Sequence, residues 1–523
     1  MRGNVYLCGP PGAGKSTVAP ILAALRGMRT VDVDTAIEAR AGRTIARIVD
    51  EEGEPAFRAV ERETIAAIDG GTVVALGGGA LEDARTREVV ETRGITVFLD
   101  ASPATCEART AHAPGTRPLL REPGALPRLH AARRPRYAAS AIRVVTDATT
   151  PEETARAIDA ALRAERVVHV ATAKPYDVAI GENAIDALAE RARPAAGGRV
   201  ALVVDERVAT LGARVARAYE AGGVAATVIA VTADESLKSL ASIGALYERF
   251  VAAGVDRRSV IAGVGGGTIG DAAGFAAATF LRGVPFVAVP TTLLSAVDAA
   301  IGGKTAINLD AGKNLAGTVT QPAHVAIAPH ALRSLPRRDV VSGYGEMLKY
   351  GLALDAALYR ALRASEAALL DDPASALDAI ARCVQLKADI VARDEEDRTG
   401  VRAVLNFGHT VGHAIEKVAG YGALRHGEAV IVGMRAALAL SAAHAGLDAR
   451  ARADADAHLA SLPVPDAWRA LDRDALVAAT ARDKKRHAGG TQFVLLDAIG
   501  RARVHDGVAA EDVRGALAEL GFR

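Results

Sequence analysis

Cysteine and long apolar runs are scarce in this sequence of 523 residues, and each shortage argues against a class of protein. The three cysteines, Cys8, Cys106 and Cys383, lie far apart without paired spacing, which argues against a disulfide framework and a cysteine-based zinc site. No run of about 18 uncharged apolar residues occurs, so no transmembrane helix is predicted. A glycine-rich loop begins at Gly9, too early for a secretory signal. We therefore expect a cytoplasmic protein with no membrane partner.

A strong charge of one sign is missing as well. Lys and Arg number 63 against 62 Asp and Glu, so the formal net charge is only +1. This balance argues against an overall electrostatic grip on nucleic acid. The hydrophobic fraction of 50% and the charged fraction of 24% exclude a mostly disordered chain. Glycine is the residue in excess, because its 51 copies exceed the average share of ~7%.

The pattern of apolar runs predicts an α/β protein with three domains. Residues 1–165 alternate short apolar runs with helical patterns, which predicts a three-layer α/β domain with a parallel sheet. A second βαβ series begins at residue 166 and predicts an α/β nucleotide-binding domain over 166–334. Ala-rich helical stretches dominate from about residue 335, so residues 335–523 are predicted to form an all-α metal-binding domain.

The individual elements follow from the same periodicities. The predicted strands are Val5–Cys8, Val73–Leu76, Thr96–Leu99, Arg166–Val170, Val200–Val204, Val260–Val264 and Pro285–Val289. The predicted helices include Ala19–Arg26, Pro55–Ile68 and Pro151–Glu165.

Residues 9–17, Gly-Pro-Pro-Gly-Ala-Gly-Lys-Ser-Thr, fit the phosphate-binding motif G-x-x-x-x-G-K-[ST]. The motif follows a predicted strand and opens a predicted helix, so backbone N–H groups and the helix dipole would face a polyanion. Lys15 would reach the terminal phosphates, and the Ser16 hydroxyl would hold Mg²⁺. A glycine-rich turn without a ligand is the alternative. The predicted nucleotide contacts are Gly12, Ala13, Gly14, Lys15, Ser16 and Thr17.

Further residues in this domain indicate which kind of molecule accepts the phosphoryl group. Asp32 and Asp34 follow a predicted strand, Arg58 begins a helix, and residues 77–79 are three glycines after another strand. An Arg-Pro-Leu-Leu segment begins at Arg117, and Arg-Arg-Pro-Arg-Tyr occupies 133–137. Taken alone, the two aspartates are more often helix caps, and the arginine is more often on a solvated face. The arginine-rich region lacks the stacking aromatics of an RNA-binding segment. Taken together and in this order, the set resembles shikimate kinase over nearly all of residues 1–165.

That resemblance implies ATP with Mg²⁺ as cofactor and shikimate as acceptor. Asp32 would lie near the Mg²⁺ ion held by Ser16, and Asp34 would orient the attacking hydroxyl. Arg117 would stabilise the transferring phosphoryl group. The residues that would contact shikimate are Asp34, Arg58, Gly78 and Arg133. The two arginines would pair with its carboxylate.

A second glycine-rich turn lies at residues 259–271, Ser-Val-Ile-Ala-Gly-Val-Gly-Gly-Gly-Thr-Ile-Gly-Asp. It contains G-x-G-x-x-G after a predicted strand, but the acidic residue expected about 20 positions later is absent. Asp205, at the end of the strand Val200–Val204, is a better candidate for a ribose contact. We predict a nucleotide-binding turn of an unusual kind, with a plain tight βα connection as the alternative.

Histidines predict a metal site in the third domain. His409 and His413 are four residues apart and share one face of a predicted helix, while Glu346 and His426 stand in other glycine-rich segments. Histidines with one carboxylate suit Zn²⁺, although a lone histidine pair is more often structural. A threonine replaces the catalytic glutamate of H-E-x-x-H, which argues against a metalloprotease.

Basic side chains beside glycines predict a cationic pocket for a phosphate and a carboxylate. They stand singly within apolar segments, whereas the charges of a solvent-exposed face would follow one another along it. These residues are Arg282, Lys304, Lys313, Lys349, Lys387, Arg402 and Lys485. With the glycine turn and the histidines, they resemble 3-dehydroquinate synthase over roughly residues 166–523.

This second resemblance implies conversion of 3-deoxy-D-arabino-heptulosonate 7-phosphate to 3-dehydroquinate and phosphate, with NAD⁺ and Zn²⁺ or Co²⁺, by a homodimer. The metal ligands would be Glu346, His409 and His426, whereas His413 would act in proton transfer. The residues around NAD⁺ would be Asp205, Glu235, Lys238, Gly267, Thr268, Ile269, Gly270, Asp271, Thr291, Thr292, Lys304 and Lys313. The residues that bind substrate or act in catalysis would be Asp298, Lys304, Asn314, Lys349, Lys387, Arg402 and Lys485, joined by Arg282 of a neighbouring subunit.

The leading hypothesis is a bifunctional enzyme, and two alternatives remain at this point. The C-terminal region could be a simple NAD- and metal-dependent polyol dehydrogenase, but the cationic set argues against that. The N-terminal domain could be a regulator without catalysis, but the intact Lys15, Ser16, Asp34 and Arg58 argue against that.

Overall fold

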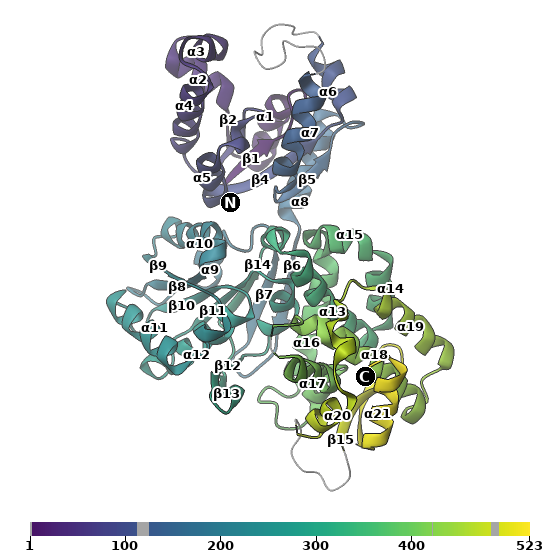
Figure 1. Ribbon diagram of the computed structural model, residues 1–523. Helices are drawn as coiled ribbons and strands as arrows, with labels where there is room; N and C mark the ends of the chain where they lie inside the picture. Colours follow the sequence, from purple (N-terminus) through teal and green to yellow (C-terminus); the bar gives the residue numbers. More distant parts are fainter. Residues whose placement is uncertain (1–2, 112–124, 421, 483–490) are drawn as a thin grey trace.

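The computed structural model describes residues 3–111, 125–420, 422–482 and 491–523. It has an N-terminal α/β unit, a second α/β unit and a mainly helical unit. The N-terminal unit, purple to blue in Figure 1, stacks on the other two, which lie side by side below it. The predicted α/β class with a helical C-terminal part is confirmed.

The first sheet has five strands in the order β2-β3-β1-β4-β5, and every pairing is parallel. The strands are β1 (Asn4–Cys8), β2 (Arg29–Asp32), β3 (Thr72–Ala75), β4 (Gly94–Asp100) and β5 (Ile142–Val145). The helices are α1 (Lys15–Arg26), α2 (Val33–Ala41), α3 (Ile45–Glu52), α4 (Glu54–Ala66), α5 (Ala84–Arg93), α6 (Pro103–Thr110), α7 (Ala125–Ala138) and α8 (Pro151–Arg163). Strands β1 and β3 are continuous buried runs because helices cover both faces of the sheet.

The second sheet has the order β6-β7-β14-β11-β10-β8-β9. Its strands are β6 (Glu165–Val170), β7 (Tyr176–Gly181), β8 (Val200–Asp205), β9 (Ala226–Val231), β10 (Val260–Gly265), β11 (Phe286–Pro290) and β14 (His324–Ile327). The helices are α9 (Leu188–Arg191), α10 (Ala209–Ala221), α11 (Leu240–Ala252) and α12 (Gly267–Thr279). A hairpin of β12 (Lys304–Leu309) and β13 (Gly312–Val319) projects from this unit (Figure 1).

The start of the second unit differs from the prediction. Strand β6 was expected to open a βαβ series, but it pairs antiparallel with β7. The connection from Val170 to Tyr176 is too short for the crossover that parallel neighbours require. The predicted strand is therefore present, whereas its predicted topology is wrong.

The helical unit contains a feature that the expectation of an all-α domain did not include. Its helices are α13 (Arg337–Leu354), α14 (Ala356–Ala364), α15 (Glu366–Asp371), α16 (Leu377–Val391), α17 (His409–Ala419), α18 (His426–His444), α19 (Ala449–Ser461), α20 (Arg473–Arg482) and α21 (Ala510–Glu519). Between α20 and α21, β15 (Thr491–Ala498) and β16 (Arg501–Val508) form an antiparallel hairpin. The Gly500 N–H at its turn donates to the Leu352 carbonyl at 2.7 Å, which docks the hairpin on α13.

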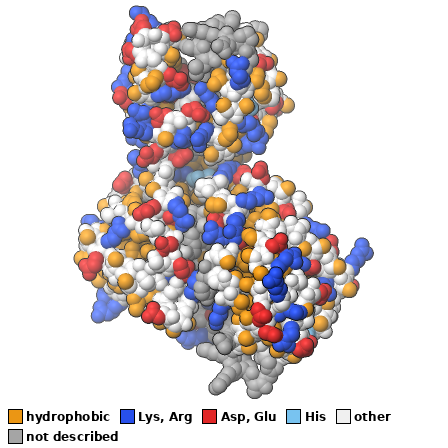
Figure 2. Space-filling view, viewed as in Figure 1, with side chains coloured by type: hydrophobic (Ala, Val, Ile, Leu, Met, Phe, Trp, Pro, Cys, Tyr) orange, Lys and Arg blue, Asp and Glu red, His pale blue; other side chains and the backbone are white. Residues whose placement is uncertain are grey.

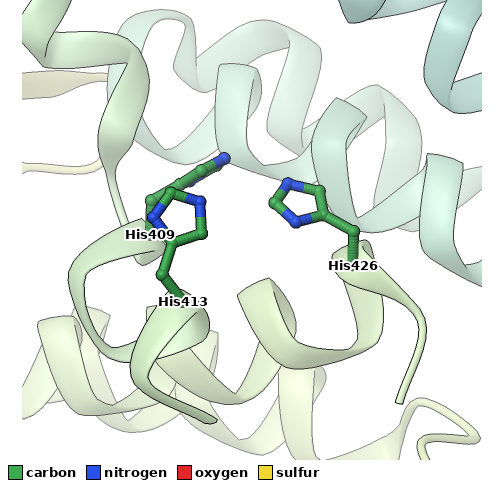
Figure 3. A group of neighbouring side chains, drawn as sticks. All are labelled: His409, His413 and His426. Carbon is green, nitrogen blue, oxygen red and sulfur yellow. The ribbon is translucent and has the colours of Figure 1, made fainter. Parts of the chain in front are cut away.

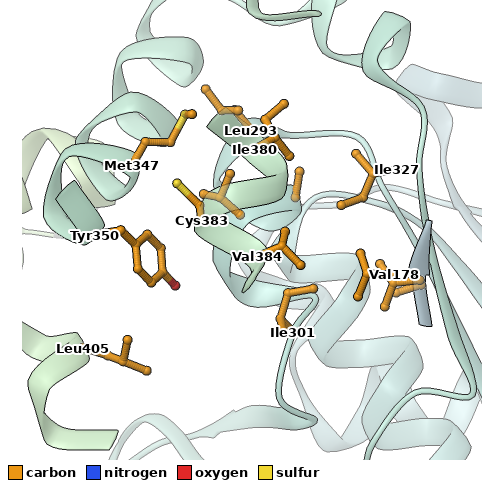
Figure 4. Packing of buried hydrophobic residues seen from close by; sticks show 14 of the residues in the cluster. Val178, Leu293, Ile301, Ile327, Met347, Tyr350, Ile380, Cys383, Val384 and Leu405 are labelled. Atoms are coloured by element: carbon orange, nitrogen blue, oxygen red, sulfur yellow. The ribbon is translucent and has the colours of Figure 1, made fainter. Parts of the chain in front are cut away.

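The second α/β unit and the helical unit share one hydrophobic core. Figure 4 shows its central part, where Ile327 of β14 faces Val384 of α16, and Tyr350 of α13 lies beyond. The first unit instead has separate clusters on the two faces of its own sheet. The lower two units are therefore built as one body, and the N-terminal unit is attached to it.

The attachment is short and polar. Only Ala164 separates the end of α8 from the start of β6. Across the seam, the Arg333 guanidinium donates to the carbonyl of Ser140. Asp372, on the same side of the seam as Arg333, holds this guanidinium at 2.9 Å. Helix α5 packs against α10 at the same seam (Figure 1).

Charged side chains of both signs are intermingled over the face seen in Figure 2. This distribution agrees with the formal net charge of +1. In the ranges that the structure describes, no helix is both long enough and apolar enough to span a bilayer.

Glu182 beside the seam generates a prediction about acid stability. Its buried carboxylate accepts from the His330 N–H at 3.1 Å and also contacts the ring. Burial alone would raise the pKa of Glu182, but the charges of His330 and Arg214 and the His330 hydrogen bond lower it. A carboxylate with a lowered pKa stabilises the fold above its unfolded pKa, and this contribution disappears as the pH falls through its folded pKa.

We therefore expect Glu182→Gln to lower the free energy of unfolding at pH 7 by ~1–3 kcal/mol. Differential scanning calorimetry over a pH series would show the difference from wild type narrowing below about pH 4.3, the usual pKa of glutamate. A difference that stays constant with pH would contradict this role of the carboxylate.

Candidate active sites

The phosphate-binding loop joins β1 to α1, as its sequence motif predicts. Gly12 and Gly14 have φ of +87° and +98°, a left-handed region that residues with a Cβ rarely adopt. A Cβ at Gly12 would also lie 2.7 Å from the Cys106 carbonyl oxygen. The Lys15 ammonium donates to the carbonyls of Gly9 and Pro10 at 2.8 and 3.0 Å, which holds it across the loop. The loop is therefore shaped to present N–H groups and one cation to a polyanion.

The predicted acceptor residues gather around the glycines after β3. Asp32 caps α2 by accepting from the Thr35 N–H at 3.1 Å, and Asp34 stands in the first turn of that helix. A Cβ built on Gly77 would lie 3.0 Å from Asp34 Oδ1 and 2.5 Å from Glu61 Oε1. Two carboxylates thus border the same turn.

The two predicted carboxylate-binding arginines reach this turn from different helices. Arg58 of α4 donates to Glu61 at 2.6 Å and to Glu54 at 2.9 Å. Arg133 of α7 donates to the Gly78 carbonyl at 3.2 Å. Because both guanidinium groups approach the glycine turn, a small carboxylic acid could bind between them.

Glu61 is a residue of this site that the sequence analysis missed. It is completely buried, and burial raises its pKa against the opposing charge of Arg58. Its spacing of three residues from Arg58 on one helix was the available signal. Arg117 lies outside the described residues, so its predicted role is not placed.

The second glycine turn connects β10 to α12 and lies beside the end of β11. The Thr291 N–H donates to the Gly265 carbonyl at 3.0 Å, and a Cβ on Gly266 would lie 3.0 Å from the Thr292 side chain. Ile269 is buried beneath the turn, so only its backbone could face a cofactor. The N-terminus of α12 is therefore bordered by both predicted threonines, as the nucleotide-binding hypothesis requires.

Most of the other predicted NAD⁺ contacts form two neighbouring ion-pair groups. Buried Lys238 donates to Asp271 at 2.6 Å and to Asn314 at 2.5 Å. Glu235 lies 3.4 Å from Lys313. Asn314, which was predicted to contact the substrate, therefore lies beside Lys238, and its predicted role stays a prediction.

Asp205 stands apart from these groups at the end of β8. Its carboxylate is buried and is engaged with Arg207 at 2.7 Å. A ribose contact there would have to compete with this pair.

A chain of alternating buried charges connects the second α/β unit with the helical unit. Lys349 of α13 contacts Asp298 at 2.8 Å and Glu346 at 2.5 Å, and Lys387 of α16 donates to the Asp298 carbonyl at 2.7 Å. Burial alone would raise the pKa of Asp298, but the two lysines lower it strongly. The carboxylates in turn raise the pKa of Lys349 above its usual range, although burial opposes this. Three of the predicted substrate residues, Asp298, Lys349 and Lys387, are therefore held together.

Two further predicted cations, Arg402 and Lys304, lie near this row of charged side chains. Buried Arg402 donates to the carbonyls of Gly302 and Glu395 at 3.3 and 3.1 Å. Burial lowers the pKa of Lys387, and Arg402 is one of the cations that add to this effect. Lys304 pairs with Asp397. Arg282 is exposed on the surface, and Lys485 lies outside the described residues.

Three histidines converge at the start of α17 and α18. One ring nitrogen from each of His409, His413 and His426 lies within 4.8 Å of the others, as Figure 3 shows. Glu346 Oε1 lies 3.5 Å from Nε2 of His409 and 3.5 Å from Nε2 of His426. Within the described chain this buried oxygen has no hydrogen-bond partner.

The protonation of these rings reflects their surroundings. Burial lowers the pKa of His409 to about 3, so its ring is neutral. Burial alone would also lower the pKa of His426, but contacts with Glu346 and Glu416 raise it to about 10. An unpartnered carboxylate oxygen facing two imidazole nitrogens is a donor set that fits Zn²⁺ or Co²⁺.

The buried charge chain generates a second prediction. Lys349→Met leaves Asp298 and Glu346 without their shared cation, and breaking a buried pair in this way costs ~3–5 kcal/mol. We expect a lower denaturation midpoint for the unfolding of the synthase part, measured by urea titration. Lys417→Met, an exposed lysine on α17, is the control and should leave the midpoint within experimental scatter. Equal midpoints for the two variants would contradict the role given to Lys349.

Comparison with known families agrees with this geometry. A shikimate kinase model matches residues 11–163, and models of the N-terminal and C-terminal parts of 3-dehydroquinate synthase match 228–342 and 343–486.

Related proteins are similar in sequence or structure to the second and third units. The 3-dehydroquinate synthase of Rhodopirellula baltica is 42% identical over 320 residues, which are 61% of this chain and 85% of that protein. The 3-dehydroquinate synthase of Paracoccus denitrificans is 42% identical over 355 residues, 66% of this chain and 96% of that protein. A structure of the 2-epi-5-epi-valiolone synthase from Streptomyces hygroscopicus, with NAD⁺ and Zn²⁺ bound, is 28% identical with a TM-score of 0.59, over 66% of this chain and 96% of that one. This chain belongs to the 3-dehydroquinate synthase family and carries a shikimate kinase domain before the synthase in the same polypeptide.

Proposed function

We propose that the two activities use the two constellations described above, one with ATP and Mg²⁺ and the other with NAD⁺ and Zn²⁺ or Co²⁺. The observation that carries the synthase proposal is the approach of Glu346 Oε1 to 3.5 Å from Nε2 of both His409 and His426, beside the buried Lys349. For the kinase, it is the approach of Asp34 and Arg58 to one glycine turn.

In the kinase, the loop would hold the ATP phosphates, and Ser16 and Asp32 would hold Mg²⁺, which neutralises phosphate charge when bound. Arg58 and Arg133 bind the shikimate carboxylate, and Glu61 keeps the Arg58 guanidinium oriented. Asp34 accepts a hydrogen bond from the attacking hydroxyl. The hydroxyl oxygen forms a bond to the γ-phosphorus while the bond to the bridging oxygen of ADP breaks, and the hydroxyl proton is released.

In the synthase, Glu346, His409 and His426 would hold the metal ion, which polarises a substrate hydroxyl when bound. The turn at 265–271 with Asp271, Thr291 and Thr292 would hold NAD⁺, which supplies reversible oxidation of a substrate alcohol. The remaining work belongs to side chains of this chain.

Cations of the buried charge chain orient the heptulosonate phosphate. Lys349, Lys387 and Arg402 bind its phosphate and carboxylate groups. Asp298 contacts both lysines and holds their ammonium groups next to each other. Because Asp298 and Glu346 raise the pKa of Lys349, its ammonium stays charged throughout the physiological range. His413, beside the metal site, moves the proton that is lost in the elimination, in which the C–H bond next to the oxidised carbon and the C–O bond to phosphate break and a C=C bond forms.

Separate variants should remove the two activities independently. Asp34→Asn should lower shikimate phosphorylation by ~10²–10⁴-fold, because the attacking hydroxyl loses its acceptor. Phosphate release from the heptulosonate phosphate should persist in that variant. Glu346→Gln should show the reverse pattern and should bind Zn²⁺ more weakly in a chelator competition.

His413→Asn is the matched control for the ligand set. It should lose phosphate release but keep Zn²⁺ affinity, since His413 is assigned to proton transfer. Loss of Zn²⁺ affinity in His413→Asn with none in Glu346→Gln would instead make the three histidines the ligands. Shikimate binding without turnover by the unmodified protein would favour a regulatory N-terminal unit.

The synthase part is also proposed to form a homodimer. Leu281 and Arg282 adopt left-handed φ of 51° and 67° at an exposed turn after α12. The nearby hairpin exposes Leu309, Leu315 and Val319, apolar side chains that a second copy could cover.

Sedimentation velocity should therefore give a dimer, and Leu315→Asp should shift it toward monomer. Arg282→Ala should keep the dimer but lower phosphate release, because this arginine is proposed to reach the partner's substrate. A monomeric wild-type protein with full activity would contradict both statements.

A further inference from the structure

We propose that Glu416 is a positioning residue of the synthase metal site, whose carboxylate fixes the His426 ring with Nε2 turned toward the metal. The inference rests on the metal site proposed above and extends it to a residue without an assigned role. Glu416 would not touch the ion, the cofactor or the substrate.

The position of Glu416 follows from the helix that carries the other histidines. It lies seven residues after His409 on α17, about two helical turns of 3.6 residues, and so shares the face of His409 and His413. His426 begins α18, the neighbouring helix. Glu416 Oε2 lies 3.0 Å from His426 Nδ1, so the carboxylate meets this ring from α17.

The His426 ring therefore bridges two carboxylates through its two nitrogens. Nδ1 faces Glu416 at 3.0 Å, and Nε2 faces Glu346 at 3.5 Å. A histidine that binds a metal through Nε2 carries no proton on that nitrogen, so its single N–H group lies on Nδ1. When Nδ1 donates that hydrogen to Glu416, the lone pair of Nε2 is left free for a metal.

The two proposed histidine ligands are oriented by different means. His409 is held by the Phe407 carbonyl at 3.2 Å from its Nδ1, and its side chain is only 10% exposed. The His426 side chain is 33% exposed, so packing constrains it less. The hydrogen bond with Glu416 supplies the constraint that burial supplies for His409.

The same contact is not needed to join α17 to α18. The two helices already share an apolar cluster that includes Val411, Ile415 and Val432. Gly433 also lets the helices approach closely, since a Cβ there would lie 2.7 Å from the Gly412 nitrogen. Removal of the Glu416 carboxylate should therefore disturb the ring and leave the helix pair intact.

The test uses the full-length protein, stripped of metal and then titrated with Zn²⁺ against a chromophoric chelator. Glu416→Ala should raise the Zn²⁺ dissociation constant by about 10–100-fold, the usual effect of losing such a partner. Glu416→Gln should have a smaller effect, because its amide oxygen can still accept from Nδ1–H. The metal-free protein of both variants should stay folded, with a melting temperature slightly below that of wild type because the Glu416–His426 contact is lost or weakened.

Asp512→Asn supplies a matched control. Asp512 lies 3.2 Å from His444 at the other end of α18, so this variant removes a carboxylate–histidine pair that is remote from the metal site. Its Zn²⁺ dissociation constant should equal that of wild type. The visible spectrum of the Co²⁺ form should change in Glu416→Ala and not in Asp512→Asn.

Two results would overturn the inference alone. One is a Zn²⁺ dissociation constant for Glu416→Ala equal to that of a wild type that binds Zn²⁺. The other is weaker Zn²⁺ binding by a Glu416→Ala protein whose metal-free form is largely unfolded at the temperature of the titration, because Glu416 would then be structural. If wild type itself takes up no Zn²⁺ or Co²⁺, the proposed metal site fails and this inference fails with it.

Discussion

The contact of Lys349 with Asp298 and Glu346 is the constraint on which the synthase part depends. Asp298 belongs to the second α/β unit, whereas Lys349 and Glu346 belong to α13 of the helical unit. Lys349 and Lys387 of the helical unit thus both contact Asp298 of the second α/β unit, and the two units share one hydrophobic core. Lys349 contacts Glu346 through Oε2, so Oε1 of Glu346 is left facing the histidines. In the function proposed above, stability, substrate charge and metal binding would therefore meet at one side chain.

Motifs with a local physical cause could be read from the sequence alone. The phosphate loop, the turn after β10 and the histidine pair depend on residues close in the chain, and the structure has each as expected. Glu61 carried only the signal of its spacing from Arg58, and Glu416 carried none, because the approach of Glu61 to Gly77 and of Glu416 to His426 arises only on folding. The contact of Asn314 with Lys238 was not foreseen for the same reason, because it depends on how the β12–β13 hairpin lies against Lys238.

Topology was the less predictable part of the fold. The residues of β6 form a strand as expected, but pairing direction depends on the short connection to β7 and not on the strand's own composition. The β15–β16 hairpin was hidden in a region dominated by Ala-rich helices. The predicted domain boundaries at 165/166 and 334/335 stay predictions, although the first falls at the change from α8 to β6.

The one-residue joint at Ala164 gives the fusion a particular character. A long flexible linker would let the two enzymes move independently. Here a single residue and the contact of Arg333 with Ser140 join them directly. What the fusion secures is equal dosage, because every ribosome that completes a synthase has already made one kinase.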